Sequence, residues 1–373
     1  MSTRDDVLKA LATVKDPEIH RPITELDMVG EVDVSGTKAT VEVLLTTTAC
    51  PMRSTIIERV ERAVMLVKGI EEVVVVMGAM TDEQRTALRE KLRGPVPQIQ
   101  FTLPESKTKV FAIASGKGGV GKSSLTANLA VAMAQRGITV GVIDADIYGH
   151  SIPGILGLTE KATMIDAELR IPPQAHGVAA LSMMAFKPGG SASPVAWRGP
   201  MLGKALEQFL TDFYWGDIDV LLIDMPPGTG DVAISLGQLL PNAEIIVITT
   251  PQSAAADVAI RAGMMSKTTR QRVVGVVENM GAISCPNCDC QIDLFGTGGG
   301  KTVADELSRA LESDIKLLAQ IPFDTELRNG GDIGQPLVLS NPDSPAAQAI
   351  YQLADTLMQR KQGLVGKLLK VFN

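Results

Sequence analysis

Aromatic side chains, histidine and cysteine are all scarce in this 373-residue sequence, and the shortages narrow the classes of protein it can belong to. Aromatic residues make up 3% of the chain and hydrophobic residues 45%, so its core would consist mainly of Ala, Val, Ile and Leu. That composition suits an α/β protein, in which β-branched strands lie beneath helices rich in alanine and leucine. Four cysteines in a chain of this length do not form a disulfide scaffold.

Long apolar runs and an excess of basic residues are also missing. No uncharged run is long enough to span a bilayer, and the first residues contain no apolar segment of the kind found in a secretory signal. We therefore expect a cytoplasmic protein. The formal net charge is −7, and an acidic chain gains little from binding a phosphate backbone, so we do not expect nucleic acid as a partner.

Residues 1–93 have the pattern of a small α/β domain. Apolar residues at helical spacing predict helices over 4–14, 52–68 and 82–93, and β-rich runs predict strands over 29–34, 40–46 and 73–77. Ser35, Gly36 and Thr37 separate the first two strands and indicate a hairpin. Residues 94–108 contain three prolines and little periodicity, which is typical of a linker.

From residue 109 the pattern changes to alternating strands and helices. Several of the strands are apolar throughout, as expected for a mostly parallel sheet covered by helices on both faces. Strands are predicted over 110–114, 139–143, 220–223, 245–249 and 273–277, and helices over 122–135, 202–213, 232–239, 255–267 and 345–360. We expect one domain over 109–361, followed by an amphipathic tail at 362–373.

A phosphate-binding loop connects the first of these strands to its helix. The run Gly116-Lys117-Gly118-Gly119-Val120-Gly121-Lys122-Ser123 satisfies G-x-x-x-x-G-K-[ST] in the required strand-to-helix context. Backbone N–H groups of this loop can surround a β-phosphate, and Lys122 can reach the β and γ oxygens. The Ser123 hydroxyl is a predicted Mg²⁺ ligand, and Ser124 belongs to the same nucleotide-binding segment.

A second lysine, Lys117, stands at the start of the loop. It can cross a two-fold axis and neutralise charge on the ATP of a partner chain, in the manner of an arginine finger. The alternative is a solvated loop lysine. The first interpretation predicts an ATP-dependent homodimer and places Lys117 with Lys122 among the catalytic residues of an ATPase.

Carboxylates follow two other strands of the same domain. Asp146 is expected to orient the attacking water, with Asp144 near the metal, and Asp224 can hold Mg²⁺ through water. Asn279, just after a strand, is positioned like a contact to the edge of adenine. Because the sequence has no Asn-Lys-x-Asp motif to read guanine, ATP is the expected nucleotide.

Three of the four cysteines lie close together, as Cys285, Cys288 and Cys290. A structural zinc ion needs four ligands, which one chain does not readily supply. A homodimer resolves this shortage, because Cys285 and Cys288 from two chains give the four thiolates of a [4Fe–4S] cluster. Zinc shared between chains and a thiol–disulfide pair remain alternatives.

The chain over residues 109–360 closely resembles the Mrp/ApbC family of iron–sulfur cluster carriers, within the class that includes MinD, ArsA and the nitrogenase iron protein. The residues that carry the resemblance are Gly116–Ser123, 144–149, 197–201, 224–231, and Asn279 with Met280. The resemblance implies ATP binding, slow hydrolysis, a homodimer, and a labile [4Fe–4S] cluster on Cys285 and Cys288. It also implies apo iron–sulfur proteins and cluster-assembly scaffold proteins as partners.

Residues 5–93 look like the small PaaD-like domain of iron–sulfur assembly factors. The likeness rests on residues 16–19 and 46–51, which include Cys50 at the start of a helix, where a thiol pKa is lowered. Cys50 is therefore a candidate reactive thiol, with a buried small apolar residue as the alternative. The sequence departs from the family pattern at Thr48 and His150, and Cys290 is an additional thiol.

Two further functions fit the same sequence. A MinD-like or chromosome-partitioning ATPase that regulates position in the cell is one, and the basic amphipathic tail at 362–373 could then touch a membrane surface. The tail could instead pack on a neighbouring helix. A chaperone ATPase for zinc or another metal is the other, because thiolates bind several soft ions.

Overall fold

The computed structural model describes residues 4–47, 52–93, 98–146, 149, 151–183, 199–228, 230–285, 287–288 and 290–359. Cys50, Thr48, His150 and the 362–373 tail, all singled out from the sequence, lie outside these residues. The chain forms two compact units. The first contains Met1–Gln98, Lys161–Pro172 and Thr211–Gly216, and the second contains Ile99–Glu160, Pro173–Leu210 and Asp217–Asn373.

The first unit is built on a three-stranded sheet in the order β1-β2-β3. Strands β1 and β2 pair antiparallel and β2 and β3 parallel, and the predicted hairpin between β1 and β2 is confirmed. Alternate residues of β2, among them Val41 and Val43, are buried, as are Ile56, Val60 and Val64 along one face of α2. The bounds are α1 Arg4–Leu11, β1 Val29–Ser35, β2 Lys38–Leu45, α2 Arg53–Met65, β3 Glu72–Ala79 and α3 Asp82–Arg93.

Two segments from beyond residue 109 complete this first unit. The segment that contains the short antiparallel pair β6 (Thr163–Met164) and β7 (Arg170–Ile171) supplies buried apolar side chains to the core formed by the N-terminal residues: Ile165, Leu169 and Ile171. Arg89 of α3 forms ion pairs with Asp166 and Glu168 at 3.1 and 3.0 Å. The folded N-terminal unit therefore includes residues that are distant from it in the sequence.

The second unit contains an eight-stranded sheet in the order β15-β12-β11-β4-β10-β5-β9-β8. All neighbouring pairs are parallel except β8 and β9, so the predicted mostly parallel sheet is confirmed. Strands β5, β9, β10 and β11 are buried along their whole length, which explains their mostly apolar sequences. The bounds are β4 Lys109–Ser115, β5 Val140–Asp144, β8 Gln174–Ala175, β9 Val178–Ser182, β10 Val220–Asp224, β11 Glu244–Thr249, β12 Arg272–Gly281 and β15 Lys316–Pro322.

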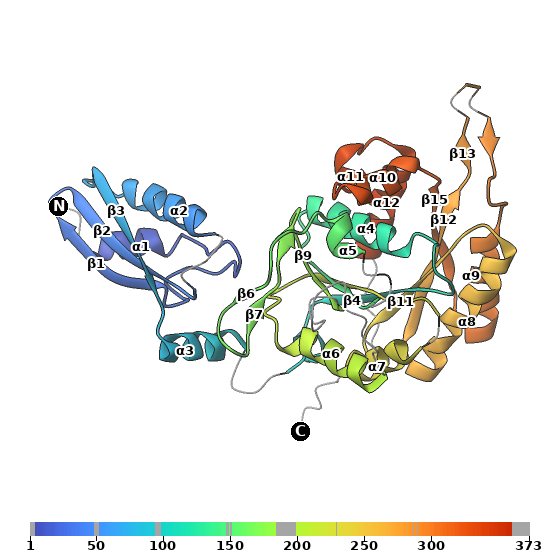
Figure 1. Ribbon diagram of the computed structural model, residues 1–373, viewed down its shortest axis with the longest axis horizontal. Coiled ribbons are helices and arrows are strands. Elements are labelled where there is room, and N and C mark those ends of the chain that lie inside the picture. Colours follow the sequence, from blue (N-terminus) through green and yellow to red (C-terminus); the bar gives the residue numbers. More distant parts are fainter. Residues whose placement is uncertain are drawn as a thin grey trace. The chain divides into compact units, whose positions relative to one another are not determined.

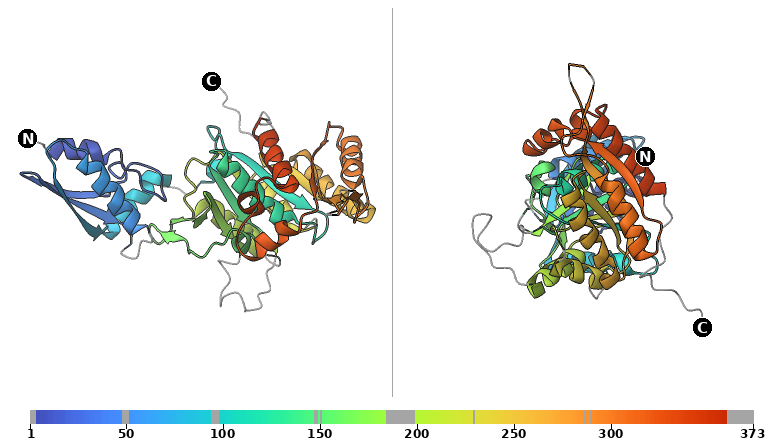
Figure 2. Two further views of the ribbon diagram at one scale, coloured as in Figure 1. Left: turned by 90° about the horizontal axis from the view of Figure 1, so that it is seen from above. Right: turned by 90° about the vertical axis from the view of Figure 1, so that its right-hand side faces the viewer.

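Helices cover both faces of this sheet (Figures 1 and 2). On one face lie α4 Lys122–Gln135, α5 Ile152–Ile155, α10 Thr325–Asp332, α11 Leu337–Ser340 and α12 Pro345–Gln359. The other face carries α6 Gly199–Thr211, α7 Asp231–Leu239, α8 Ser253–Thr269 and α9 Gly299–Leu311. Strand β4 lies between β11 and β10, where the strand order reverses, so the loop after β4 occupies the usual ligand position of such a sheet.

Several elements of the second unit were not predicted from the sequence. They include β15, α9, α10 and α11, and a short hairpin of β13 (Ile283–Ser284) and β14 (Gln291–Ile292). Within the predicted linker, Gln100–Thr102 form a 3-10 turn, and Phe101 is fully buried. Among the described residues, none of the helices is long and apolar enough to cross a membrane.

Candidate nucleotide site and cysteine hairpin

The loop between β4 and α4 has the geometry of a phosphate cradle. Gly121 has a φ of +77°, and a Cβ there would lie 2.3 Å from Asn279 Nδ2. A Cβ on Gly116 would lie 2.2 Å from the backbone of Val258 in α8. Any side chain at either position would displace the packed neighbours. The loop motif therefore needs glycine at both positions because the chain passes closely against other elements.

Strand register brings two predicted carboxylates together at the carboxyl end of the sheet. Asp224 of β10 pairs in register with Asp144 of β5, which in turn pairs with Ser182 of β9. Both carboxylates are fully buried. The parallel arrangement thus places Asp144 and Asp224 side by side, next to the start of α4.

Asp224 is surrounded by groups from the first turns of α4. Its Oδ2 lies 2.7 Å from Lys122 Nζ and accepts a hydrogen bond of 2.6 Å from Ser123 Oγ. Thr126 Oγ1 lies 2.9 Å from the other oxygen, Oδ1. Lys122 is itself buried, so this ion pair is largely removed from water. The contact with Thr126 was not anticipated from the sequence.

Asp144 is held by the residues that follow it and by the neighbouring strand β9. Its carboxylate accepts hydrogen bonds from the backbone N–H of Asp146 at 3.1 Å and from Ser182 Oγ at 3.3 Å. Burial, together with the neighbouring Asp224 carboxylate, raises the pKa of Asp144 to about 7, against the opposing effect of Lys122. Asp146 is also buried, and its Oδ1 accepts from the backbone N–H of Gly149 at 2.9 Å.

This set of oxygen atoms fits a magnesium ion. Mg²⁺ takes carboxylate and hydroxyl oxygens together with substrate phosphates. The Ser123 hydroxyl and an Asp224 oxygen are already in contact, and the buried Asp144 carboxyl beside them would ionise more readily next to a cation. Two buried carboxylates opposite a single lysine would gain electrostatically from a divalent cation.

Lys117 and Asn279 contact groups of their own chain. Lys117 Nζ donates to Gln252 Oε1, just before α8, at 3.1 Å. Asn279 Nδ2 donates to the Val120 carbonyl oxygen of the phosphate loop at 2.9 Å. Asn279 Oδ1 is buried and has no hydrogen-bond partner among the described residues. It is therefore an acceptor still available to a ligand.

A cavity of about 280 Å³ opens beside the phosphate loop, with Asn279 in its wall. Its other lining residues include Gly119 and Ser124 of the loop region, Phe323, and Arg328 of α10. The segment after β15 was not predicted to contribute. Asp324 is the N-cap of α10, and its side chain accepts from the backbone N–H of Glu326 at 2.8 Å. An aspartate is a common first residue of a helix, so the sequence did contain a signal for the start of α10.

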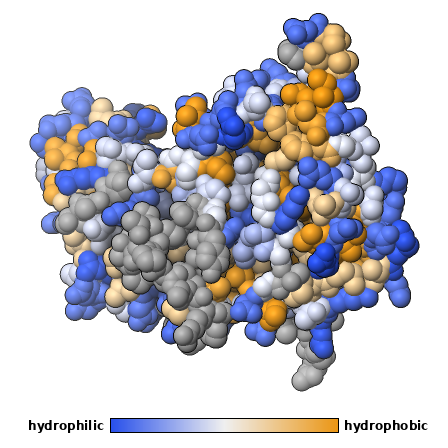
Figure 3. All heavy atoms as spheres, turned by 45° about the vertical axis from the view of Figure 1, so that its right-hand side comes forward, coloured by the Kyte–Doolittle hydropathy of each residue, from blue (hydrophilic) through white to orange (hydrophobic). Residues whose placement is uncertain are grey.

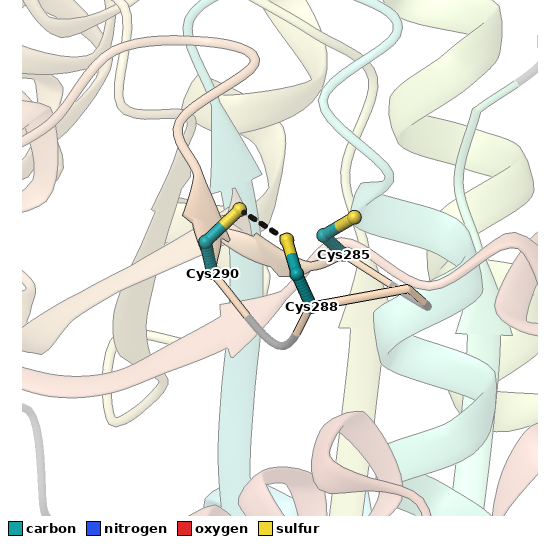
Figure 4. A group of neighbouring side chains, drawn as sticks. All are labelled: Cys285, Cys288 and Cys290. Atoms are coloured by element: carbon teal, nitrogen blue, oxygen red, sulfur yellow. Dashed lines mark hydrogen bonds between the residues drawn. The ribbon is translucent and has the colours of Figure 1, made fainter.

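The cysteines at 285, 288 and 290 lie on the hairpin of β13 and β14, which extends from β12 (Figure 1). The Cys285 N–H donates to the Cys290 carbonyl oxygen at 2.9 Å and closes the hairpin. The thiols of Cys288 and Cys290 point toward each other, 3.2 Å apart, with Cys285 beside them (Figure 4). The backbone N–H of Cys290 lowers the pKa of Cys288, which favours the thiolate that metals bind.

A buried carboxylate holds the base of this hairpin. Glu278, at the end of β12, accepts from the backbone N–H of Gly300 in α9 at 2.6 Å and from Gln320 Nε2 at 2.7 Å. Hydrophobic side chains gather on the projecting hairpin (Figure 3), and Ile292 and Leu294 are 40% and 55% exposed. The hairpin segment thus combines a fixed base with exposed apolar side chains in and just after β14.

Comparison with known proteins agrees with this geometry. Residues 106–358 match the family model described as NUBPL iron-transfer P-loop NTPase, and residues 4–76 match the model of an iron–sulfur cluster assembly protein. The iron-sulfur cluster carrier protein of Mycobacterium tuberculosis is 53% identical over 372 residues, covering 98% of this chain and 97% of the relative. The protein of the same name from Deinococcus radiodurans is 41% identical over 354 residues, with 95% and 94% coverage.

Among solved structures, a nucleotide-binding protein of Archaeoglobus fulgidus in complex with ADP is similar to this chain. The TM-score is 0.51 at 34% identity, and the match covers 64% of this chain and 90% of the other. The family match spans most of the chain, and the relatives match it over nearly their full length. The chain therefore belongs to the iron-transfer P-loop NTPase family, with an N-terminal iron–sulfur cluster assembly domain.

Proposed function

We propose that this protein is an ATP-hydrolysing carrier that binds an iron–sulfur cluster and transfers it to apoproteins in the cytoplasm. One observation supports this most directly. The end of β12 contacts the nucleotide loop through Asn279 and leads within a few residues into the hairpin that begins at Ile283 and carries Cys285. A change at the phosphate loop therefore has a short covalent path to the cysteines.

The cargo in this proposal is a [4Fe–4S] cluster shared by two chains. Cys285 and Cys288 of each chain supply the four thiolates that such a cluster requires. Cys288 is exposed and Cys285 is partly so, which leaves the thiolates within reach of a recipient protein. The recipients are apo iron–sulfur proteins, and cluster-assembly scaffold proteins are the proposed donors.

The ATP site uses the residues gathered at the end of the sheet. The loop 116–121 would bind the phosphates through its N–H groups, and Lys122 would move from Asp224 toward the β and γ oxygens. Ser123, Asp224 and Asp144 would hold Mg²⁺, which neutralises phosphate charge when bound. Asp146 would orient the attacking water, and the free oxygen of Asn279 would accept from the amino group of adenine.

Hydrolysis in this proposal is slow because the site is incomplete in one chain. Lys117 Nζ is hydrogen-bonded to Gln252 and would not neutralise the phosphates of its own chain, so a partner's Lys117 would have to complete the charge neutralisation. ATP would thereby couple dimer formation to the arrangement of the two cysteine hairpins. The relatives named as carriers favour this function over a spatial regulator.

Anaerobic reconstitution with iron and sulfide tests the cargo directly. We expect visible absorption, about four irons and four sulfides per dimer, and a dimeric mass by light scattering. The Cys288→Ala variant should lose the chromophore and still bind ATP. A colourless protein that dimerises with ATP would refute the carrier proposal. Transfer to an apoprotein, followed by the recovery of its activity, tests the second half of the proposal.

A further inference from the structure

The cysteine hairpin arranges three thiols, and a shared Cys₄ cluster needs only two from each chain. The backbone fixes Cys285 and Cys290 opposite each other, through the hydrogen bond from the Cys285 N–H to the Cys290 carbonyl oxygen. The neighbouring residues Ser284 and Gln291 are joined by a second hydrogen bond of 2.7 Å, from Gln291 Nε2 to Ser284 Oγ. Cys288 lies in the turn between them, and its sulfur faces that of Cys290 (Figure 4).

The distances between the sulfurs match one metal ion better than several. All three Sγ atoms lie within 4.8 Å of one another, and those of Cys288 and Cys290 are 3.2 Å apart. Thiolates bound to one tetrahedral ion at about 2.3 Å lie about 3.8 Å apart. Each thiolate of a [4Fe–4S] cluster binds a different iron at the corner of a cube, so its thiolates must lie farther apart.

The geometry points to a mononuclear site on a single chain, in which Cys285, Cys288 and Cys290 bind one thiophilic divalent ion of the Zn²⁺ or Fe²⁺ class. Each thiol would lose its proton to solvent on binding, and a water or an external thiolate would take the fourth position. Thiolates favour such ions over Mg²⁺ or Ca²⁺. Cys288 and Cys290 are exposed, so an ion can enter without opening the fold.

Cys290 gains a role in this site that the shared cluster does not give it. The chain could hold a metal ion as a monomer, before or after two hairpins meet around a cluster. This inference goes beyond the proposed function, because a three-thiolate site requires neither ATP nor a second chain. The same thiolates cannot serve both states at once, so an ion bound here would exclude the shared cluster.

Titration with Co²⁺ tests the site, because sulfur-to-cobalt absorption reports thiolate ligands without iron or sulfide. The full chain would be reduced, freed of metal and kept anaerobic without nucleotide. We expect one Co²⁺ per chain and a monomeric mass by light scattering. Cys290→Ser should weaken Co²⁺ binding by about 100-fold, roughly the share of one ligand in a four-ligand site. Cys290→His, which retains a ligand atom, should recover most of that loss.

Two results would overturn the inference. One is half an equivalent of Co²⁺ per chain together with a dimeric mass, which would place the ion between chains. The other is unchanged Co²⁺ binding by Cys290→Ser, with ATP binding showing that this variant is folded. Cluster reconstitution is measured in a separate experiment. A protein that forms the cluster but has no one-chain Co²⁺ site would refute the mononuclear site and leave the proposed carrier function standing.

Discussion

Lys117 Nζ donates a hydrogen bond of 3.1 Å to Gln252 Oε1 of the same chain. The lysine that the sequence analysis assigned to a partner's nucleotide is thus held by its own chain. Gln252 immediately precedes α8, whose backbone at Val258 lies against Gly116, the residue next to Lys117. Reaching a partner would require Lys117 to leave Gln252, at the cost of a hydrogen bond from a charged donor.

Replacing Gln252 by alanine should therefore speed ATP hydrolysis. A hydrogen bond to a charged group contributes about 1.5–3 kcal/mol, so even part of that energy would raise the rate several-fold at protein concentrations that limit dimer formation. The measurement is ATPase rate against protein concentration. Lys117→Ala, alone or with Gln252→Ala, should abolish hydrolysis and leave ATP binding intact. A slower Gln252→Ala enzyme would show that Gln252 positions the lysine for catalysis.

The contact between Thr126 and Asp224 should be required for magnesium-dependent binding. In Thr126→Val, a buried carboxylate oxygen loses its partner, at a cost of about 1–3 kcal/mol. We expect weaker ATP binding in the presence of Mg²⁺, measured by calorimetry. Thr356→Val is a matched control. Thr356 is exposed, and its hydroxyl bonds to the carbonyl of Gln352 at 2.8 Å, as that of Thr126 does to Lys122 at 2.9 Å. Equal effects of the two substitutions would contradict the assignment.

The stability of the first unit should depend on the ionisation of Asp16. Asp16 is 4% exposed and accepts from the backbone N–H groups of Glu18 and Ile19, and burial raises the pKa of its carboxyl. Because the pKa is raised in the folded state, the protonated carboxyl stabilises the fold. This contribution to the free energy of unfolding is complete below the ordinary pKa of 3.8 and is lost as the pH rises through the folded-state pKa. The uncharged Asp16→Asn should thus gain stability relative to the wild type as the pH increases.

Hydrogen exchange of peptides from residues 4–45, corrected for intrinsic rates, measures this difference across the pH range. Glu71→Gln provides a control, because it removes one negative charge from an exposed position. A constant difference between Asp16→Asn and wild type at all pH values would show that Asp16 ionises as it does in the unfolded chain.

Leu169 should stabilise the first unit although it lies far beyond the linker in the sequence. Leu169 is fully buried with the N-terminal core, and Leu→Ala changes at such sites cost about 2–5 kcal/mol. Leu169→Ala should increase hydrogen exchange in β1 and β2. Met164→Ala, at a 48% exposed position of the same segment, should have little effect. Unchanged exchange in both variants would exclude the segment from the core.

The local features of the fold could be predicted from the sequence, and the features that depend on long-range pairing could not. The bounds of α4 were predicted without error, and each predicted strand overlaps an observed one. The spacing of apolar residues and the glycines and prolines of loops are local signals, so a short stretch of sequence is enough to locate these elements. The proximity of Asp144 to Asp224 depends on the register of β5 and β10, which no local pattern encodes. Ile165 and Leu169 were assigned to the domain over 109–361, because no neighbouring residue in the sequence indicates that they pack against the N-terminal core.

The composition of the first unit has a consequence for how the chain folds as it is synthesised. The chain passes between the units five times, after Gln98, Glu160, Pro172, Leu210 and Gly216. N-terminal domains generally fold first on the ribosome, as soon as their own residues have emerged. Here the N-terminal core lacks Ile165, Leu169 and Ile171 until the Ile99–Glu160 part of the second unit has been translated. The first unit therefore stays incompletely packed until part of the second unit has been synthesised.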